Sequence, residues 1–238
     1  MSQWPYSTPH VSPLYNELPY QYRGIRKVSI FCRCEPASMD RFLPPELVRV
    51  GDVCEVFVMH VPEAGDLGTY DEAGLVIPVR YGDRVGAHVA LEYVTTDDSL
   101  CAGREIWGYP KKLCTMNFDE TAEQHIHSRV ERRGQRLIEA EFRPAQVEFD
   151  KPQMQPRLQV KMFARADGKG PDYYQIVHNQ LQNFELTHHV TGQANLQLDG
   201  NAEDPLHELA VKELVGAEMI VGDFLLSHGT ILDDLAKA

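Results

Sequence analysis

The sequence has no hydrophobic run long enough to cross a membrane and no excess of basic residues. No apolar stretch approaches the roughly 18 residues that a spanning helix requires. Lys and Arg number 23 against 35 Asp and Glu, so the formal net charge is -12. Because this excess repels phosphate groups, we expect neither a nucleic-acid partner nor a membrane partner. A few basic groups inside a pocket can still bind a small anion.

Cysteine is scarce and follows no ligand or disulfide pattern. The five cysteines are Cys32, Cys34, Cys54, Cys101 and Cys114, an odd number without a C-x-x-C pair. Neither a disulfide framework nor a zinc knuckle is expected. The first residues lack the basic-then-apolar layout of a secretory signal. We therefore expect a cytoplasmic location, with Cys32 and Cys34 as small hydrophobic residues on one face of a strand.

Residues 20–238 contain no internal repeat and no linker rich in Gly, Ser or Pro. This predicts one domain over residues 20–238. Residues 1–19 differ, because four prolines punctuate an otherwise polar run. They predict an extended arm that packs on the surface or on a neighbouring subunit.

Hydrophobic residues recur mainly in short or alternating runs that are typical of strands. The runs are 28–34, 54–61, 75–81, 88–94, 124–130, 137–142, 158–163, 173–177 and 193–198. Turn signals such as Arg133-Gly134 and Asp167-Gly168 separate them. Strands without intervening amphipathic helices indicate a mainly β (α+β) fold, with an antiparallel, barrel-like or sandwiched sheet.

Helical patterns are few and short. One helix is expected over Ser38–Leu43, capped by Ser38 and stopped by two prolines. The apolar spacing of Asp204–Leu214 predicts a second helix. Residues 231–235 are expected to add a last turn, and the apolar residues of 220–226 are compatible with subunit contacts.

The segment Gly103–Leu113 carries the most unusual chemistry of the chain. Two adjacent lysines follow a Gly-Tyr-Pro turn and lie between apolar flanks. A lysine becomes a nucleophile only as the free amine, which requires a lowered pKa through burial or a neighbouring cation. In an extended chain the side chains of Lys111 and Lys112 diverge, so one can enter a pocket. Without further information, a solvated surface pair is the simpler interpretation.

This segment resembles the signature of the acetoacetate decarboxylase family, in which a G-R-E element precedes a P-K-K element. The first lysine of that element forms a Schiff base with a β-keto acid, and the family is itself the standard example of an activated lysine. Further stretches are similar in the same order: 57–60, 68–72, 77–79, 191–192, 196–198 and 205–213. The resemblance implies a cone-like double sheet with a few short helices, a homo-oligomer, a small oxo-acid substrate and no cofactor or metal.

The resemblance also assigns four site residues. Lys111 matches the Schiff-base lysine, and Lys112 matches the adjacent lysine that is associated with its lowered pKa. Glu72 and Glu55 match two pocket glutamates. Independently of the family, Glu55 lies in an apolar strand, where a lone carboxylate is costly unless it is paired.

Three positions depart from the family pattern. The family carries an arginine in the early strand as a contact for the substrate carboxylate, but Ile25 stands there, near Arg23 and Arg26. That contact is therefore unassigned. Val190 stands where the decarboxylases have a tryptophan, and Glu92 replaces an apolar residue in a central strand. These departures predict a pocket of different shape and, where Glu92 points inward, of higher polarity.

The resemblance implies two reactions. In the first, Lys111 forms an imine with a β-keto acid such as acetoacetate, and carbon dioxide leaves. In the second, an aldolase-dehydratase uses the same lysine enamine to condense pyruvate or another oxo acid with an aldehyde. Retention of Glu55 and Glu72 favours decarboxylation, whereas the altered pocket positions favour the second reaction. A carrier protein that binds without turnover is a third interpretation, against which the retained residues argue.

A metal site is the alternative from another functional class. His125, His127 and Glu131 reproduce the H-x-H-x-x-x-E spacing of a cupin strand. The glycines of that motif are absent, since Asp119 and Ile138 stand in their places. An exposed polar strand is the expected outcome.

The net charge adds an expectation about the site. Nearby carboxylates stabilise the ammonium form of a lysine. If Lys111 is the nucleophile, we expect the acidic charge to lie on the outer surface, and we expect the surroundings of Lys111 to be apolar or locally cationic through Lys112.

Overall fold

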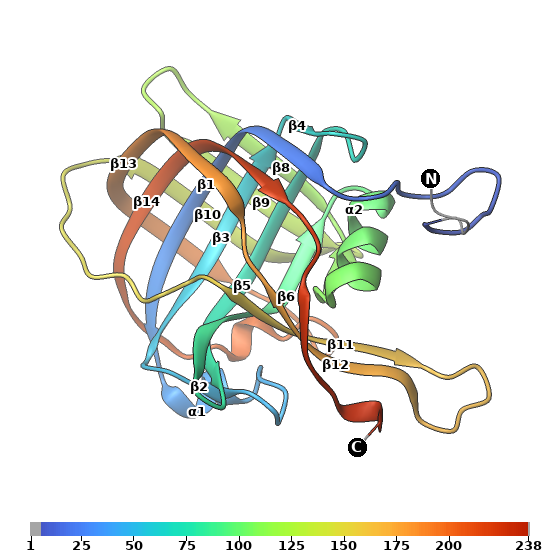
Figure 1. The fold of residues 1–238 in the computed structure, drawn as a ribbon. Coiled ribbons are helices and arrows are strands. Elements are labelled where there is room, and N and C mark those ends of the chain that lie inside the picture. Colours follow the sequence, from blue (N-terminus) through green and yellow to red (C-terminus); the bar gives the residue numbers. More distant parts are fainter. Residues whose placement is uncertain (1–5, 238) are drawn as a thin grey trace.

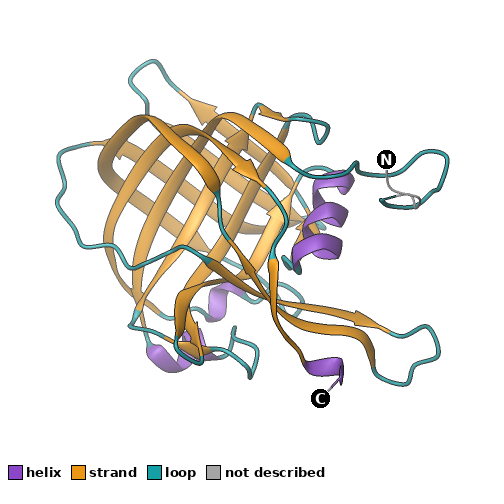
Figure 2. Cartoon of the chain, in the orientation of Figure 1, coloured by secondary structure: helices purple, strands orange, loops and turns teal. Residues whose placement is uncertain are grey.

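A computed structural model describes residues 6–237, and strands dominate it (Figure 2). The strands are β1 (Tyr20–Cys34), β2 (Val48–Arg49), β3 (Val53–Val61), β4 (Glu63–Ala64), β5 (Tyr70–Tyr81), β6 (Arg84–Val94), β7 (Lys111–Leu113), β8 (Thr115–Glu120), β9 (Ile126–Arg132), β10 (Gln135–Pro144), β11 (Arg157–Ala164), β12 (Pro171–Asn179), β13 (Gln182–Leu198), β14 (Val211–Leu226) and β15 (Thr230–Asp234). The helical elements are α1 (Pro36–Asp40), α2 (Asp97–Ala102), the π-helical turn η1 (Gly103–Trp107) and the 3₁₀ turns η2 (Leu206–Glu208) and η3 (Leu235–Lys237).

All 15 strands within residues 6–237 belong to one curled sheet (Figure 1). Its main order is β15-β12-β11-β6-β5-β3-β1-β14-β13-β10-β9-β8. Strand β6 pairs in parallel with β7 and β11, and most other pairs are antiparallel. The sheet curls until β8 contacts β3 and β5, but it does not close, because β8 and β15 stand at opposite ends of the order. The predicted mainly β fold with few short helices is confirmed.

Strand alternation gives the sheet two chemically different faces. The core face, inside the curl, is apolar: Val28, Ile30, Cys32, Cys54, Val56, Val58, Leu75 and Met219. The cavity face, on the other side of the same strands, carries Lys27, Ser29, Glu55, Phe57, Glu72 and Glu218. Successive side chains of a strand point to opposite faces, so one sequence builds a core and a site at once. The predicted burial of Cys32 and Cys34 on one face is confirmed.

The described part of the arm, residues 6–19, contains turns and no strand. Tyr15 and Leu18 are buried in a cluster that includes Trp107. The Tyr15 hydroxyl donates a hydrogen bond of 2.5 Å to Glu105. These residues therefore pack beside the helical segment of their own chain. The first five arm residues of the predicted segment, and Ala238, lie outside the described residues.

The helix predictions need correction. Helix α1 begins earlier than expected, and Ser38 lies inside it, where its hydroxyl donates to the carbonyl of Glu35 at 2.7 Å. The helix expected over Asp204–Leu214 is wrong, because only η2 is helical and strand β14 begins at Val211. Pairing of β14 with β1 and β13 outweighs the local apolar spacing. The expected turn at 231–235 is mostly strand β15.

Helix α2 and η1 form the main helical segment, which sequence patterns missed. It packs against β6, β7 and β11, near the arm (Figures 1 and 2). Its last turn is π-helical and ends at Gly108, whose φ of 83° is left-handed. A Cβ at Gly108 would lie 2.6 Å from the Lys161 backbone, so only glycine permits this close approach. Among residues 6–237, no helix has the length and apolar character needed to cross a bilayer.

Candidate active site

A cavity of about 790 Å³ lies on the cavity face of the sheet. Its floor comes from β1, β3, β5, β6 and β14, and its cover from α2, η1 and residues 151–157 and 180–186. The predicted site residues Lys111, Glu72 and Glu55 all line it, as do Ile25 and Glu92. Most of the remaining lining side chains are apolar. The fold thus brings three of the four predicted site residues to one cavity.

Lys111 enters the cavity from the short strand β7. This strand pairs in parallel with β6, and Lys111 is the register partner of Glu92. Above it lies Gly103, where an added Cβ would stand 2.6 Å from Cδ of Lys111. Because Gly103 has no side chain, it leaves open the channel through which the Lys111 side chain passes. Only about 7 % of Lys111 is exposed.

The amine of Lys111 is held by a carboxylate and a hydroxyl. Its Nζ donates hydrogen bonds to Glu72 Oε2 at 2.7 Å and to Ser99 Oγ at 3.2 Å. It also lies 5.4 Å from the centre of the Tyr70 ring. Burial lowers the pKa of Lys111, but Glu72 and Glu92 outweigh this effect and raise the pKa above its ordinary value. The expectation of an apolar or cationic setting is wrong, because two acidic side chains, Glu72 and Glu92, lie beside the amine.

Glu92 points inward and is buried, with 3 % exposed. Its Oε2 has no hydrogen-bond partner among the residues that the structure describes. Burial and the neighbouring Glu72 raise the pKa of Glu92 well above its ordinary value. The Lys111 ammonium thus pairs with Glu72, while the raised pKa of Glu92 favours its protonated form. A carboxylate and a carboxylic acid at one amine form an acid–base pair.

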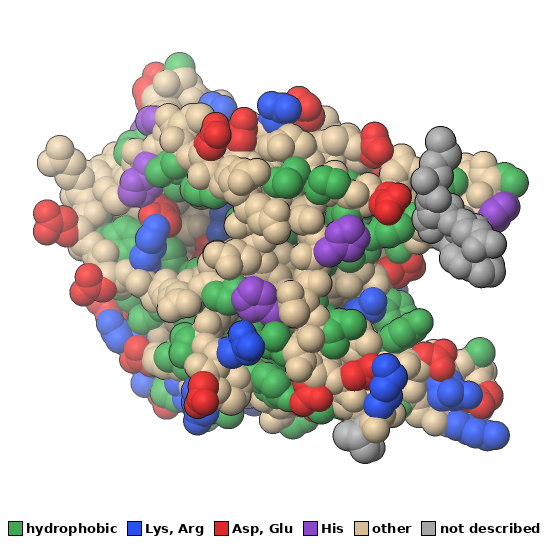
Figure 3. Space-filling view, in the orientation of Figure 1, with side chains coloured by type: hydrophobic (Ala, Val, Ile, Leu, Met, Phe, Trp, Pro, Cys, Tyr) green, Lys and Arg blue, Asp and Glu red, His purple; other side chains and the backbone are tan. Residues whose placement is uncertain are grey.

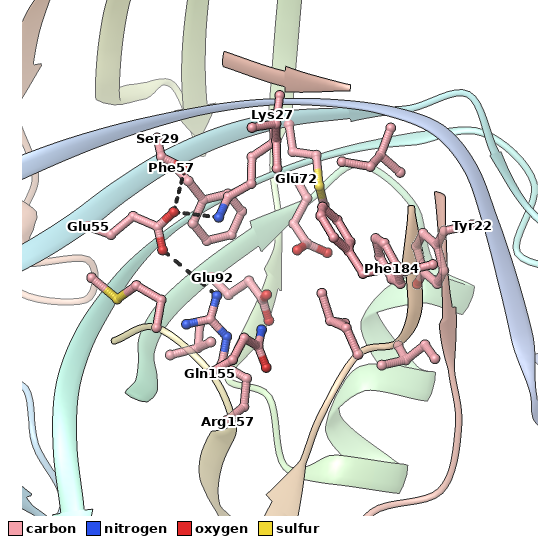
Figure 4. Close-up of a pocket in the computed structure, with 18 of the residues that line it drawn as sticks. Tyr22, Lys27, Ser29, Glu55, Phe57, Glu72, Glu92, Gln155, Arg157 and Phe184 are labelled. Atoms are coloured by element: carbon pink, nitrogen blue, oxygen red, sulfur yellow. Dashed lines mark hydrogen bonds and ion pairs between the residues drawn. The ribbon is translucent and has the colours of Figure 1, made fainter. Parts of the chain in front are cut away.

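Glu55 lies in a second charged group of the cavity (Figure 4). It accepts hydrogen bonds from Lys27 and, at 2.5 Å, from Ser29, while Arg157 Nη2 lies 3.8 Å from its Oε2. Burial raises the pKa of Glu55, but Lys27 and Arg157 outweigh it, so the pKa is lowered. One buried carboxylate is therefore compensated by two cations, as a buried charge requires.

Lys27 and Arg157 are cavity residues that the sequence reasoning missed. Alternation along β1 indicates Lys27, because it lies two residues from Ile25 on the same face. Arg26 points to the opposite face, where it donates a hydrogen bond to Glu120, and Arg23 forms an ion pair with Glu63. Neither arginine lines the cavity. Arg157 carries no comparable signal, since it reaches the cavity through the pairing of β11 with β6.

The structure does not bring Lys112 to the cavity. Its Nζ donates to Asp204 Oδ1 at 2.7 Å and to the Glu203 carbonyl at 2.6 Å. Arg132 also lies against Asp204, so Lys112 joins a cluster on the other side of β7. Val190 likewise packs towards the core face, and its neighbour His189 lines the cavity instead.

The alternative metal motif does not assemble into a cluster. His127 contacts Glu139 at 3.3 Å, and Glu131 pairs with Arg129. No group of three or more His, Cys, Asp or Glu side chains within residues 6–237 is arranged to hold a metal ion. On the visible face of the molecule, acidic and basic side chains are intermixed (Figure 3).

Comparison with known proteins identifies relatives over nearly the whole chain. The family model of acetoacetate decarboxylase (ADC) matches residues 5–235. Acetoacetate decarboxylase 1 of Mesorhizobium japonicum is 29% identical, covering 98% of this chain and 96% of the relative. Acetoacetate decarboxylase of Acidiphilium cryptum is 27% identical, covering 96% of this chain and 95% of the relative.

Solved structures share the fold. Acetoacetate decarboxylase from Legionella pneumophila aligns with a TM-score of 0.85 at 23% identity, over 97% of this chain and 94% of that chain. The enduracididine biosynthesis enzyme MppR, complexed with pyruvate, gives 0.84 at 16% identity, over 98% and 99%. An acetoacetate decarboxylase-like enzyme from Sphingomonas wittichii RW1 gives 0.84 at 19%, over 99% and 100%. At these identities the likeness concerns the fold.

Proposed function

The chain belongs to the acetoacetate decarboxylase family, and we propose that it decarboxylates an acetoacetate-like β-keto acid through a Schiff base on Lys111. The observation that carries this proposal is the buried Lys111 amine, hydrogen-bonded to Glu72 at 2.7 Å inside a mostly apolar cavity. Such an amine is shielded from bulk water and has a proton acceptor in contact. Both features suit imine formation.

Imine formation begins when Lys111 transfers its proton to Glu72. The free amine then attacks the keto carbon, and the carbinolamine loses its oxygen as water with the proton that Glu72 received. A protonated imine remains, and Glu72 is again a carboxylate. The high pKa of Lys111 makes this internal transfer necessary, because the resting amine is protonated.

Carbon–carbon cleavage follows from the protonated imine. The bond to the carboxylate breaks, its electron pair moves towards the iminium nitrogen, and carbon dioxide leaves an enamine. Glu92, whose raised pKa favours the protonated form, protonates the enamine carbon in this proposal and recovers a proton from water. Hydrolysis of the imine releases the ketone and restores the lysine. The net reaction consumes one proton and releases carbon dioxide and a ketone.

A second candidate is an aldolase-dehydratase that condenses an oxo acid with an aldehyde through the same enamine. Three observations favour it. The pair of Glu72 and Glu92 can remove one proton and deliver another, and the cavity has room for a second reactant. The structural neighbour MppR is complexed with pyruvate in its solved structure. We rank it second because Lys111, Glu55 and Glu72 stand in the positions of the decarboxylase pattern.

The two reactions are separated by offering the protein acetoacetate and, separately, pyruvate with an aldehyde. Carbon dioxide release from acetoacetate supports the proposal, and condensation without such release supports the second candidate. Borohydride added during turnover should reduce the imine and leave a mass adduct on the peptide that contains Lys111. An adduct on another lysine would refute the assignment. We further propose that the enzyme is cytoplasmic and homo-oligomeric, which cell fractionation and the mass in solution would test.

A further inference from the structure

The cavity has two chemically different sides, with the Lys111 site between them. In Figure 4, Arg157 and Glu55 lie to one side of Glu72 and Glu92, while Phe184 and Tyr22 lie to the other. Lys111 Nζ contacts Glu72, so it lies between the charged and the aromatic side. A 3-oxo acid is arranged in the same order along its length, with a charged carboxylate at one end, the carbonyl carbon next, and the substituent at the other end.

The charged side has one positive charge in excess. Glu55 carries one negative charge, and Lys27 and Arg157 carry two positive charges. Arg157 Nη2 lies 3.8 Å from Glu55, and Nη1 has no hydrogen-bond partner among residues 6–237. The guanidinium therefore retains donors that a planar carboxylate can use. This side is suited to a single carboxylate, at a position unrelated to the early-strand Ile25.

The opposite side is aromatic and reaches the cavity mouth. Tyr22 stacks on Phe224 with 4.4 Å between ring centres. Phe184 and Leu186 line the cavity yet remain 45% and 51% exposed. Large apolar side chains at the rim of a concave site lose water when an apolar ligand covers them. These four side chains offer no charge to a second anionic group.

The cavity is also too large for a four-carbon keto acid. Its volume of about 790 Å³ lies in the range of roughly 300–1,000 Å³ that is typical of sites for drug-sized ligands. A small keto acid would contact Lys111 and Arg157 and leave the aromatic side empty. The aromatic side therefore has no role in binding acetoacetate itself.

We propose that the substrate is a 3-oxo acid with a bulky apolar substituent, whose carboxylate binds Arg157 and whose tail lies against Tyr22, Phe184 and Phe224. This inference rests on the proposed Schiff-base function and names its substrate class. Arg157 and Phe184 are then the two specificity-determining residues, one for each end of the substrate. Lys27 supports Arg157 by neutralising Glu55.

A chain-length series tests the size of the substituent. The probes are acetoacetate, 3-oxohexanoate, 3-oxooctanoate and 3-oxo-3-phenylpropanoate. We expect kcat/KM to rise at least about ten-fold from acetoacetate to 3-oxooctanoate, because four more methylenes leave water. Equal or falling values along the series would overturn the inference, while turnover of acetoacetate would leave the proposed function intact.

Phe184→Ala tests the tail contact. The preference for 3-oxooctanoate over acetoacetate, measured as the ratio of their kcat/KM values, should fall at least about five-fold. Tyr173→Ala is the matched control, because Tyr173 is an aromatic residue of similar exposure, 51%, outside the cavity. An unchanged ratio in the Phe184 variant would contradict the tail contact. Loss of oligomeric mass with an unchanged ratio would assign the exposed rim to a subunit interface instead.

Arg157→Met tests the carboxylate contact by imine trapping. Borohydride trapping on Lys111 is compared for 3-oxooctanoate and for 2-heptanone, the ketone that it yields. The variant should lose at least about ten-fold in trapping with the acid and much less with the ketone, and Arg157→Lys should restore part of the loss. Equal losses for both probes would overturn the role of Arg157.

The trapping assay also separates failure of the inference from failure of the proposed function. If no acid releases carbon dioxide but 2-heptanone is trapped more efficiently than acetone, decarboxylation fails and the apolar tail site stands. If acids are turned over without any preference for size, decarboxylation stands and the tail site fails.

Discussion

The two faces of the central sheet use the same strands for opposite purposes. On the core face of β3, Val56 and Val58 are buried among other hydrophobic side chains. On the cavity face of the same strand, Glu55 and Phe57 border an open volume. The core face is filled, so its side chains make contacts on every side. The cavity face keeps space and charge, which costs stability and provides chemistry.

The contrast continues into the tandem lysines of β7. Lys111 points to the cavity face and Lys112 to the cluster around Asp204. Neighbours in the sequence thus have different partners because alternation separates them by the thickness of the sheet. Chemical similarity of adjacent residues says little about a shared role when they lie on a strand.

The largest expected effect concerns these two lysines. Lys111→Met should lower kcat by about 10⁴-fold or more, because the nucleophile is lost. Lys112→Met should stay within about ten-fold of the parent, because Lys112 does not touch the cavity. Steady-state decarboxylation by both variants measures the difference. Equal losses would mean that Lys112 acts on the amine in a conformation that differs from this one.

Gly103→Ala should separate activity from stability. The added methyl would stand 2.6 Å from Cδ of Lys111, and the flexible end of the lysine can move aside. We expect about a 10²-fold loss of activity through misplacement of the amine. The midpoint of urea unfolding should change little, because alanine favours the helix. Cys101→Ala in α2 is the control, and similar activity losses in both variants would contradict the steric explanation.

The two faces should also differ in how much unfolding free energy is lost when a side chain is truncated. Val56→Ala, on the core face, should cost about 2–3 kcal/mol of unfolding free energy, since it leaves a new void in a filled region. Met59→Ala, on the cavity face, should cost about 1 kcal/mol despite its larger side chain, because it borders existing space. Urea denaturation of both variants tests this order. A larger cost for Met59 would mean that the cavity is closed in solution.

The last expected effect is a gain in stability. The pKa of Glu92 is raised in the folded protein, so the unfolded chain releases this proton at a lower pH than the folded protein does. The free energy of unfolding therefore falls as the pH rises from the ordinary pKa of a glutamate towards the raised pKa. Glu92→Leu should remove that slope and add about 1–2 kcal/mol at pH 8. Unfolding at pH 5 and pH 8 measures it. A gain that is larger at pH 5 would contradict the assignment.

Prediction from the sequence succeeded where the signal was local. Runs such as 54–61 and 88–94 were recognisable as strands because their hydrophobic pattern is carried by adjacent residues. The helix expected over Asp204–Leu214 failed because a strand in the middle of a sheet is stabilised by its neighbours β1 and β13. Helix α2 escaped notice because its six residues carry too little periodicity.

The site shows the same division. The sequence named Lys111, Glu72 and Glu55, which the fold brings to one cavity, from their resemblance to a known pattern. Their catalytic roles stay predictions. Arg157 could not be predicted from the sequence, because it lies far from Glu55 along the chain. Only the parallel pairing of β11 with β6 brings it into the cavity.

By itself, the sequence determined the family and the strand-rich class, because these depend on residue identity and short-range alternation. The tertiary structure decided which charges meet. It placed Glu92 against Lys111, turned Lys112 away, and set Lys27 and Arg157 beside Glu55. Charge pairing is decided by strand register and by the curl of the sheet, and both result from packing over the whole chain.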